Sequence, residues 1–219
     1  IAKKAGVKTA ETIWEAKQKC PELVLVKPHF DEYVKYSKQV FEIYTSFTDR
    51  VESFGIDECW LDVTGSEKLF GDGKTIADTI RQAVKEKTGL TISVGVSFTK
   101  TLAKLGSDLK KPDATTVLDE EHYMQIIGDM SPSKMIMIGR HTAEKLEKLN
   151  IRTIRDLANA DRTALRYQFG VIGDALVNAA QGVETEEVKL YYDVRIPKSI
   201  SKGTTTPRNI QTDRKSTRL

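Results

Sequence analysis

The succession of helix- and strand-forming segments changes at about residue 119, and this change constrains the fold most. Before it, helical periodicities alternate with short apolar runs of strand length. From Asp119 to about residue 187 the periodic segments are helical and their connections are short. The chain is therefore expected to be α+β, with a mixed region followed by a small all-α region. Its 219 residues, 39% hydrophobic and 30% charged, suit one or two domains with a real core.

The mixed region has a definite order of expected elements. They are a helix around 13–16, a strand over 23–26, a helix capped by Asp31, two strands over 51–54 and 59–63, a helix between Gly73 and Gly89, a strand over 90–97, a helix from about Thr99 that ends before Pro112, and a strand over 115–118. The centre of this order is αββαβ. It matches a ferredoxin-like βαββαβ unit whose first strand is missing.

The helical region contains a candidate phosphate-binding element over 138–149, which looks like the hairpin and second helix of a helix-hairpin-helix. Such a hairpin holds DNA phosphates with backbone N–H groups and reads no sequence. Met137 stands where its first glycine is expected. The candidate DNA-binding residues are Gly139, Arg140, His141, Thr142 and Lys145. An ordinary helical hairpin is the alternative. Further helices are expected over 153–158, 162–169 and 173–181.

Asp57 and Glu58 are adjacent acids inside an apolar, strand-forming run. An ionised carboxylate is costly to bury without a partner or a cation. Neighbours on a strand point to opposite faces, so the two acids can converge on one ion only at a strand end or hairpin. Gly55 supplies such a bend. Carboxylates without nearby His or thiolate ligands suit Mg²⁺ bound together with a phosphate substrate. A solvated surface turn is the alternative.

Two sequence blocks, in order, carry a family resemblance. The first is Gly55-Ile56-Asp57-Glu58-Cys59-Trp60-Leu61-Asp62, and the second is Lys100-x-x-Ala103-Lys104-x-x-Ser107-Asp108-x-x-Lys111-Pro112-Asp113. They resemble successive motifs of the Y-family (translesion) DNA polymerases of the DinB type, the first of which reads Ser-x-Asp-Glu-x-(aromatic)-Leu-Asp. Gly55, Cys59 and Ala114 replace the usual serine, alanine and glycine, while Trp60 keeps the aromatic.

The resemblance implies site residues, cofactors and partners. Asp57 would bridge two Mg²⁺ ions, and Glu58 would bind the ion that activates the primer hydroxyl. Lys111 would contact the dNTP triphosphate, and Asp108 would either orient it or balance its charge. Lys3 stands where the family has a triphosphate-binding arginine, and lysine lacks the bidentate fork. A solvated Lys-Lys-Pro turn is the alternative for Lys111. Primer-template DNA, dNTP and a candidate sliding clamp are the partners.

The same resemblance implies a domain division. Residues 1–27 would be part of the fingers and 28–118 the palm without its first strand. Residues 119–187 would be the thumb, and 188–219 a linker and the start of the little finger. The chain begins at Ile1, so both ends are expected to be cuts. The third metal carboxylate and the aromatic gate against ribonucleotides would lie upstream, and the chain alone would be inactive.

Charge and hydropathy favour a protein with a polyanion partner over a membrane-spanning or secreted one. Of 34 basic and 31 acidic residues, seven basic and one acidic fall after residue 194, which gives this tail +6 and the body −3. A basic tail favours a polyanion partner. The tail's basic residues are Arg195, Lys198, Lys202, Arg208, Arg214, Lys215 and Arg218. No apolar run reaches membrane-spanning length and no leader is evident, so we expect a cytoplasmic protein.

The cysteines and histidines give no pattern of a metal site. Cys20 and Cys59 are far apart, and the three histidines are scattered. Reduced thiols and no zinc site are expected.

Two other functions compete with the polymerase hypothesis. Nucleotide cyclases also place carboxylates on a palm hairpin, but their Gly-Gly-(Asp/Glu)-Glu-Phe is not matched over 55–59. A non-catalytic DNA-binding module would apply if the acids were simply solvated. Mg²⁺ titration of a full-length protein with primer-template and dNTPs separates the three.

Overall fold

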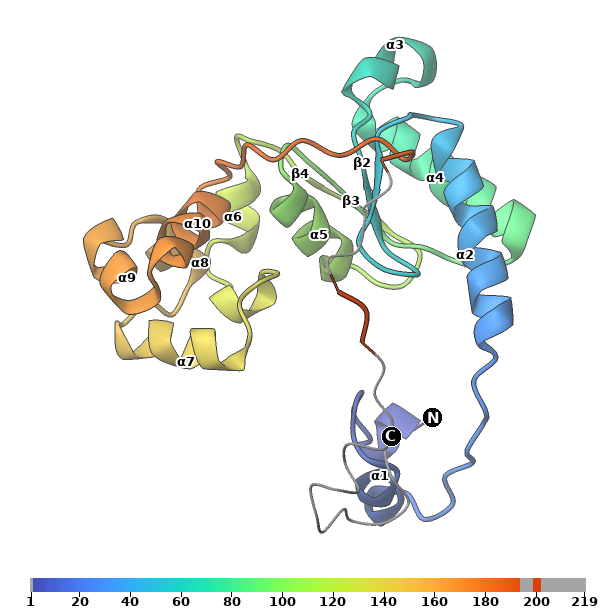
Figure 1. The fold of residues 1–219 in the computed structure, drawn as a ribbon, viewed down its shortest axis with the longest axis horizontal. Coiled ribbons are helices and arrows are strands. Elements are labelled where there is room, and N and C mark those ends of the chain that lie inside the picture. The colour runs from blue at the N-terminus through green and yellow to red at the C-terminus, as the bar shows by residue number, and fades with distance from the viewer. Residues whose placement is uncertain (1, 194–198, 202–219) are drawn as a thin grey trace.

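Helices and two small sheets make up the described part of the chain, residues 2–193 and 199–201 of a computed structural model (Figure 1). The elements are η1 (Ala2–Ala5), α1 (Ile13–Lys19), α2 (Phe30–Thr45), β1 (Val51–Ser53), β2 (Cys59–Leu61), η2 (Thr64–Ser66), α3 (Glu67–Phe70), α4 (Gly73–Thr88), β3 (Val94–Ser97), α5 (Lys100–Leu109), β4 (Thr115–Leu118), α6 (Tyr123–Ile127), η3 (Pro132–Lys134), α7 (Arg140–Lys148), α8 (Ile154–Ala158), α9 (Arg162–Phe169) and α10 (Val171–Ala180). The expected mixed region followed by a helical one is confirmed.

Local sequence explains where several helices begin and end. The side chain of Asp72 accepts a hydrogen bond from the Thr75 N–H and starts α4, which Gly89 ends with a φ of 72°. Thr99 caps α5 in the same way. Thr153 and Asp156 form a reciprocal capping box at the start of α8. At these boundaries a polar side chain or a glycine satisfies orphan backbone groups or ends the helix.

The strands pair in two separate ladders within the described residues. β1 and β2 are antiparallel, with Val51 opposite Leu61 and Ser53 opposite Cys59. β3 and β4 are parallel, with Val94 opposite Thr115. β2 and β3 are not hydrogen-bonded to each other, so each keeps one unpaired edge. A ferredoxin-like unit would join these strands in one continuous sheet, whereas the described chain has two two-stranded sheets.

Helix α5 packs directly on β3 because Gly95 has no side chain. A Cβ built on Gly95 would lie 1.9 Å from the carbonyl oxygen of Ala103 and 2.5 Å from the backbone nitrogen of Ser107. Any larger residue would push the helix away. The contact fixes α5, which carries the second sequence block, on the strand beside it.

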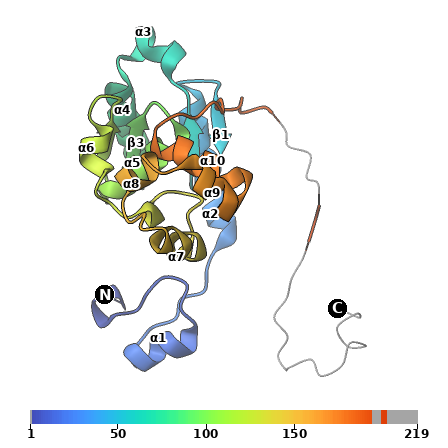
Figure 2. The ribbon, with the colours of Figure 1, turned by 90° about the vertical axis from the view of Figure 1, so that its left-hand side faces the viewer.

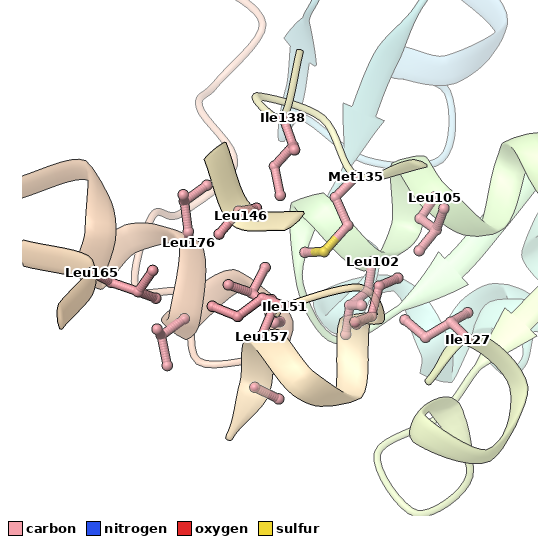
Figure 3. Packing of buried hydrophobic residues seen from close by; sticks show 14 of the residues in the cluster. Leu102, Leu105, Ile127, Met135, Ile138, Leu146, Ile151, Leu157, Leu165 and Leu176 are labelled. Carbon is pink, nitrogen blue, oxygen red and sulfur yellow. The ribbon is translucent and has the colours of Figure 1, made fainter. Parts of the chain in front are cut away.

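Two apolar clusters form the interior. The strand-side core contains Phe41, Ile43, Tyr44, Val51, Ile76, Ile80 and Val84. The helical core contains Leu102, Leu105, Leu118, Ile127, Met135, Ile138, Leu146, Ile151, Ile154, Leu157, Ala158, Leu165, Leu176, Val177 and Ala180 (Figure 3). The helical core therefore crosses residue 119, because α5 and β4 contribute side chains to it. The division at residue 119 stays a prediction.

A strap, residues 183–191, connects α10 back to the strand side, and Figure 1 shows it crossing above β4 and β2. Glu184 accepts hydrogen bonds from the backbone N–H, at 3.0 Å, and from the hydroxyl of Thr101. The Lys189 N–H donates to Glu52 at 3.1 Å, and Glu52 accepts a 2.7 Å ion-paired hydrogen bond from Lys100. Both side chains of that pair are at most 10% exposed. The strap thus ends on a buried ion pair.

Four local expectations were wrong. Residues 23–26 form no strand, because no described strand pairs with them, and Val24 and Val26 are each 81% exposed. Asp31 does not cap α2: the residue before the helix is His29, and Asp31 lies in the first turn. The strand expected over 90–97 is only Val94–Ser97, the part that β4 pairs. Helix α10 starts at Val171, two residues early, after Gly170 with a φ of 64°.

Figures 1 and 2 show α1 apart from the rest, joined to α2 by an extended segment. No helix among the described residues is long and apolar enough to cross a membrane.

Candidate active site at the β1–β2 hairpin

The acids Asp57 and Glu58 lie in the turn between β1 and β2, as expected from the bend at Gly55. The N–H groups of Phe54 and Gly55 both donate to the Glu58 carbonyl, at 2.9 and 3.2 Å. The hydroxyl of Ser37 on α2 donates to the carbonyl of Ile56. The turn is held by its own backbone and by a neighbouring helix. Both carboxylates therefore remain available for other contacts.

Trp60 anchors the hairpin to α5. Its indole Nε1–H donates to the carbonyl of Lys100 at 2.9 Å, and its ring lies 4.7 Å from that of Phe54, centroid to centroid. A buried indole normally finds such an acceptor. The contact brings the first and second sequence blocks together.

Four charged side chains form an alternating row, which we call the charge row: Glu58, Lys104, Asp108 and Lys111. The ammonium of Lys104 lies 3.1 Å from Glu58 and 2.8 Å from Asp108, and Asp108 lies 2.7 Å from Lys111. Lys104 is 15% exposed, whereas Lys111 is 56% exposed. The row joins the hairpin acid to the end of α5.

The charge row shifts the proton affinities of its inner members. Partial burial lowers the pKa of Lys104, but hydrogen bonds to Asp108 and Glu58 outweigh this and raise it above its usual value. Burial raises the pKa of Asp108, and hydrogen bonds from Lys104 and Lys111 outweigh it and lower that pKa. Both groups are therefore charged at neutral pH.

A cavity of about 810 Å³ opens beside the hairpin, and Glu58 and Lys111, the two ends of the charge row, both line it. Its polar side includes Asp57, Glu58, Lys104 and Lys111. Its apolar side comes from α2, α4, the unpaired edges of β2 and β3, and the segment that leads into β3. It includes Tyr36, Val40, Trp60, Ile76, Ile92 and Val96. We call this cavity the groove. It has the size and the mixed lining of a ligand site.

The donor set of the hairpin fits a hard divalent cation. Mg²⁺ is typically held by one or two carboxylates together with substrate phosphates and water. Asp57 and Glu58 supply two such carboxylates to the groove, which Lys111 also lines. Within the described residues, no group of three His, Cys, Asp or Glu side chains converges on a point. The described chain thus offers two ligands, and phosphate oxygens or other groups would complete the shell.

Sequence reasoning missed an ion-pair cluster of Arg81, Lys85 and Asp113, which we call the Arg81 clamp. Arg81 on α4 donates to the Asp113 carboxylate at 2.7 Å, and Lys85 donates to the same carboxylate at 3.0 Å. Asp113 has a φ of 53°, a conformation that needs support in a non-glycine residue. The clamp fixes the backbone two residues after Lys111. Only the regular helical spacing of Arg81 and Lys85 hinted at a shared face.

Lys3 is not brought to the charge row. It is exposed in η1, which Figures 1 and 2 place with α1, away from the hairpin. Its role in nucleotide binding stays a prediction.

The candidate DNA-binding residues gather on the first turns of α7. Gly139 precedes the helix, and the side chains of Arg140 and His141 are 86% and 93% exposed. Thr142 is half-buried, and the Lys145 ammonium lies 5.9 Å from the centre of the Phe169 ring.

Met137, at the expected glycine position, has a φ of 70°. Its backbone takes the conformation that a glycine would favour. The element before α7 is the short η3, which ends at Lys134, and the helix-hairpin-helix stays a prediction. The basic residues of the tail lie outside the described residues.

Comparison with known proteins gives concordant results in sequence and structure. The impB/mucB/samB family model matches residues 1–108. A DNA polymerase IV of Acetivibrio thermocellus is 49% identical over 210 residues, 95% of this chain and 52% of that protein. A DNA polymerase IV of Francisella philomiragia subsp. philomiragia is 37% identical over 212 residues, 97% of this chain and 60% of that protein.

Solved structures agree. DinB from Sulfolobus solfataricus has a TM-score of 0.76 at 29% identity, over 85% of this chain and 55% of that one. An insertion ternary complex of Dbh DNA polymerase has a TM-score of 0.77 at 29% identity, over 85% and 55%. The chain spans about half the length of the curated relatives it matches.

Proposed function

This chain belongs to the impB/mucB/samB family, the Y-family of DNA polymerases, and we propose that the whole protein adds deoxynucleotides to a primer along a DNA template, past lesions. The observation that carries this proposal is the shared lining of the groove. One hairpin presents two carboxylates to the same groove that Lys111 lines with its ammonium. Phosphoryl transfer needs these two kinds of group, metal-binding acids and a cation for the triphosphate.

In the proposed mechanism each residue has a limited task. Asp57 and Glu58 would hold Mg²⁺, which, bound as two ions, would stabilise the negative charge on the attacking and leaving oxygens. Lys111 binds a non-bridging phosphate oxygen of the dNTP, and its contact with Asp108 at 2.7 Å directs its ammonium. The Arg81 clamp holds the backbone from which Lys111 extends.

The groove supports a further part of the proposal. Two unpaired strand edges face it, and apolar side chains line it. In the whole protein we propose that another strand fills this groove, pairs with β2 and β3, and carries a third carboxylate. Primer-template DNA would lie along the N-terminus of α7, and a sliding clamp and a cytoplasmic location are expected from the family.

The acids are tested in a full-length polymerase with primer-template, dNTPs and Mg²⁺. We expect Asp57→Asn and Glu58→Gln each to lower primer extension by at least about a hundredfold, because a metal ligand is lost. Thermal unfolding should change little, since neither side chain contributes to a core and Lys104 keeps Asp108 as a partner. Asp62→Asn, at the other end of β2, is the matched control and should retain extension. Near-normal extension by either site variant would contradict the proposal.

The Lys111→Ala variant tests triphosphate binding. Removing one phosphate-facing cation should raise the KM for dNTP about tenfold or more, with the Kd for primer-template little changed. Lys110→Ala, which alters the adjacent ammonium, is the control. If the affinity for primer-template fell instead, Lys111 would be a DNA-backbone contact.

A further inference from the structure

Lys104 occupies the centre of the charge row, between Glu58 and Asp108. Its ammonium lies 3.1 Å from a Glu58 oxygen and 2.8 Å from an Asp108 oxygen, and its side chain is 15% exposed. A salt bridge so placed is shielded from water more than the surface pairs of the molecule, such as Lys74–Asp78 at 60% and 40% exposure. It therefore constrains Glu58 more strongly than an exposed pair would.

The backbone that carries Lys104 has little freedom to move. Gly95 allows α5 to contact β3 directly, and a Cβ there would overlap Ala103, the residue before Lys104. Leu102 and Leu105, on either side, are 0% and 2% exposed in the helical core. The Lys104 ammonium can consequently change partners only by rotation of its own side chain.

A divalent cation at Glu58 and the ammonium of Lys104 would compete for one carboxylate. Both are positive, and both require a carboxylate oxygen at close range. Asp108 provides Lys104 with a second partner on the same helix, four residues on, so the ammonium would remain paired after leaving Glu58. The Lys104 ammonium can thus pair with either Glu58 or Asp108, whereas the cation would bind the hairpin carboxylates.

We propose that Lys104 is a positioning residue that holds Glu58 in place before the divalent cation arrives, yields it to the cation, and then pairs with Asp108 alone. This inference rests on the proposed metal role of Glu58. The exchange keeps the carboxylate from turning toward solvent while the site is empty of metal. It also makes the affinity for the cation lower than two carboxylates alone would give.

The test measures cation affinity directly, without catalysis. Free Mn²⁺ is followed by electron paramagnetic resonance during titration of the 219-residue chain. In Lys104→Met, which keeps the aliphatic stem, we expect Mn²⁺ to bind at least about fivefold more tightly, since a competing and repelling cation is gone. Lys104→Arg should restore the lower affinity. Lys74→Met, which breaks an i, i+4 pair of the same geometry at 2.7 Å, should leave it unchanged.

A second measurement follows the lysine itself. In the nitrogen-15 NMR spectrum of lysine ammonium groups, the Lys104 signal should shift on Mg²⁺ addition in the unaltered chain and should not do so in Glu58→Gln. Urea unfolding confirms that each variant is folded.

The outcomes separate the two proposals. If Lys104→Met binds Mn²⁺ equally or more weakly while Glu58→Gln abolishes binding, the exchange is wrong and the metal site stands. If Glu58→Gln leaves Mn²⁺ binding intact, the metal assignment fails and the exchange fails with it.

Discussion

The helical core and the strand-side core differ in how completely the described chain closes them. Leu146, Ile154, Leu157 and Leu165 are all 0% exposed in the helical core, which is built of apolar side chains. The strand-side core is smaller, its strands β2 and β3 are half-buried throughout, and the groove opens beside it. Its deepest polar contact is the Glu52–Lys100 ion pair.

The two regions obtain their stability in different ways. The helical core relies on burial of apolar surface, at about 25 cal/mol per Å². The strand side leaves apolar surface uncovered, with Phe54 52% and Ile56 46% exposed, and relies more on the ion pair and the strap. We infer that the strand side is the less stable region and the one that accepts added chain.

The largest effect should come from the open groove. We expect the 219-residue chain alone to extend no primer with Mg²⁺ and dNTPs, because it brings two carboxylates and an unfilled strand position to the site. Its binding to DNA should be weak, independent of sequence and steeply reduced by salt. Gel extension assays and fluorescence anisotropy at several salt concentrations measure both. Robust extension would show that the strand side is complete without a further strand.

The buried ion pair comes next. Glu52→Gln should lower the free energy of unfolding by about 3–5 kcal/mol, because the buried Lys100 ammonium is left with the exposed Glu186 carboxylate, 3.7 Å away. Burial raises the pKa of Glu52, but hydrogen bonds from Lys100 and the Lys189 N–H outweigh it and hold the pKa below its usual value.

The pair therefore stabilises the fold above a pH of about 4.3 and loses this contribution as the pH falls through the folded-state pKa. Urea unfolding at pH 7 and pH 3 should show the difference between the unaltered chain and Glu52→Gln shrinking at low pH. A difference independent of pH would mean that the pair is not the source of stability.

The smallest effect compares one leucine from each region. Leu146→Ala in the helical core should cost about 2–5 kcal/mol, since the side chain is 0% exposed and leaves a cavity. Leu61→Ala on β2 should lower the free energy of unfolding clearly less. Leu61 is half-buried and borders the groove, so its truncation removes fewer packing contacts. Equal losses, measured by urea unfolding, would erase the distinction between a closed and an open core.

Local sequence signals were enough for the elements that depend on local chemistry. Asp72 and Gly89 mark the ends of α4, and the acids fall in a hairpin turn because strand-forming runs flank Gly55. Residues 23–26 have the same apolar composition as a strand, but a strand also needs a partner, which no local pattern reveals.

Contacts between distant residues were beyond the sequence for the same reason. Lys104 and Glu58 are brought together by the packing of α5 on β3, and the strap contacts the strand side through scattered polar groups without a period. The second sequence block suggested that α5 belongs to the site. It did not suggest that the same helix completes the helical core.

The double duty of α5 has a mechanical consequence. One side of this helix is embedded among the apolar residues of the helical region through Leu102 and Leu105, and Lys104 extends from it to Glu58. Helix α5 therefore connects the helical region, which is expected to bind DNA, rigidly to the β1–β2 hairpin, which is expected to carry the chemistry. Any tilt of the helical region is transmitted to the acid hairpin without an intervening loop. We expect substitutions deep in that interior to alter nucleotide selection while touching neither nucleotide nor metal.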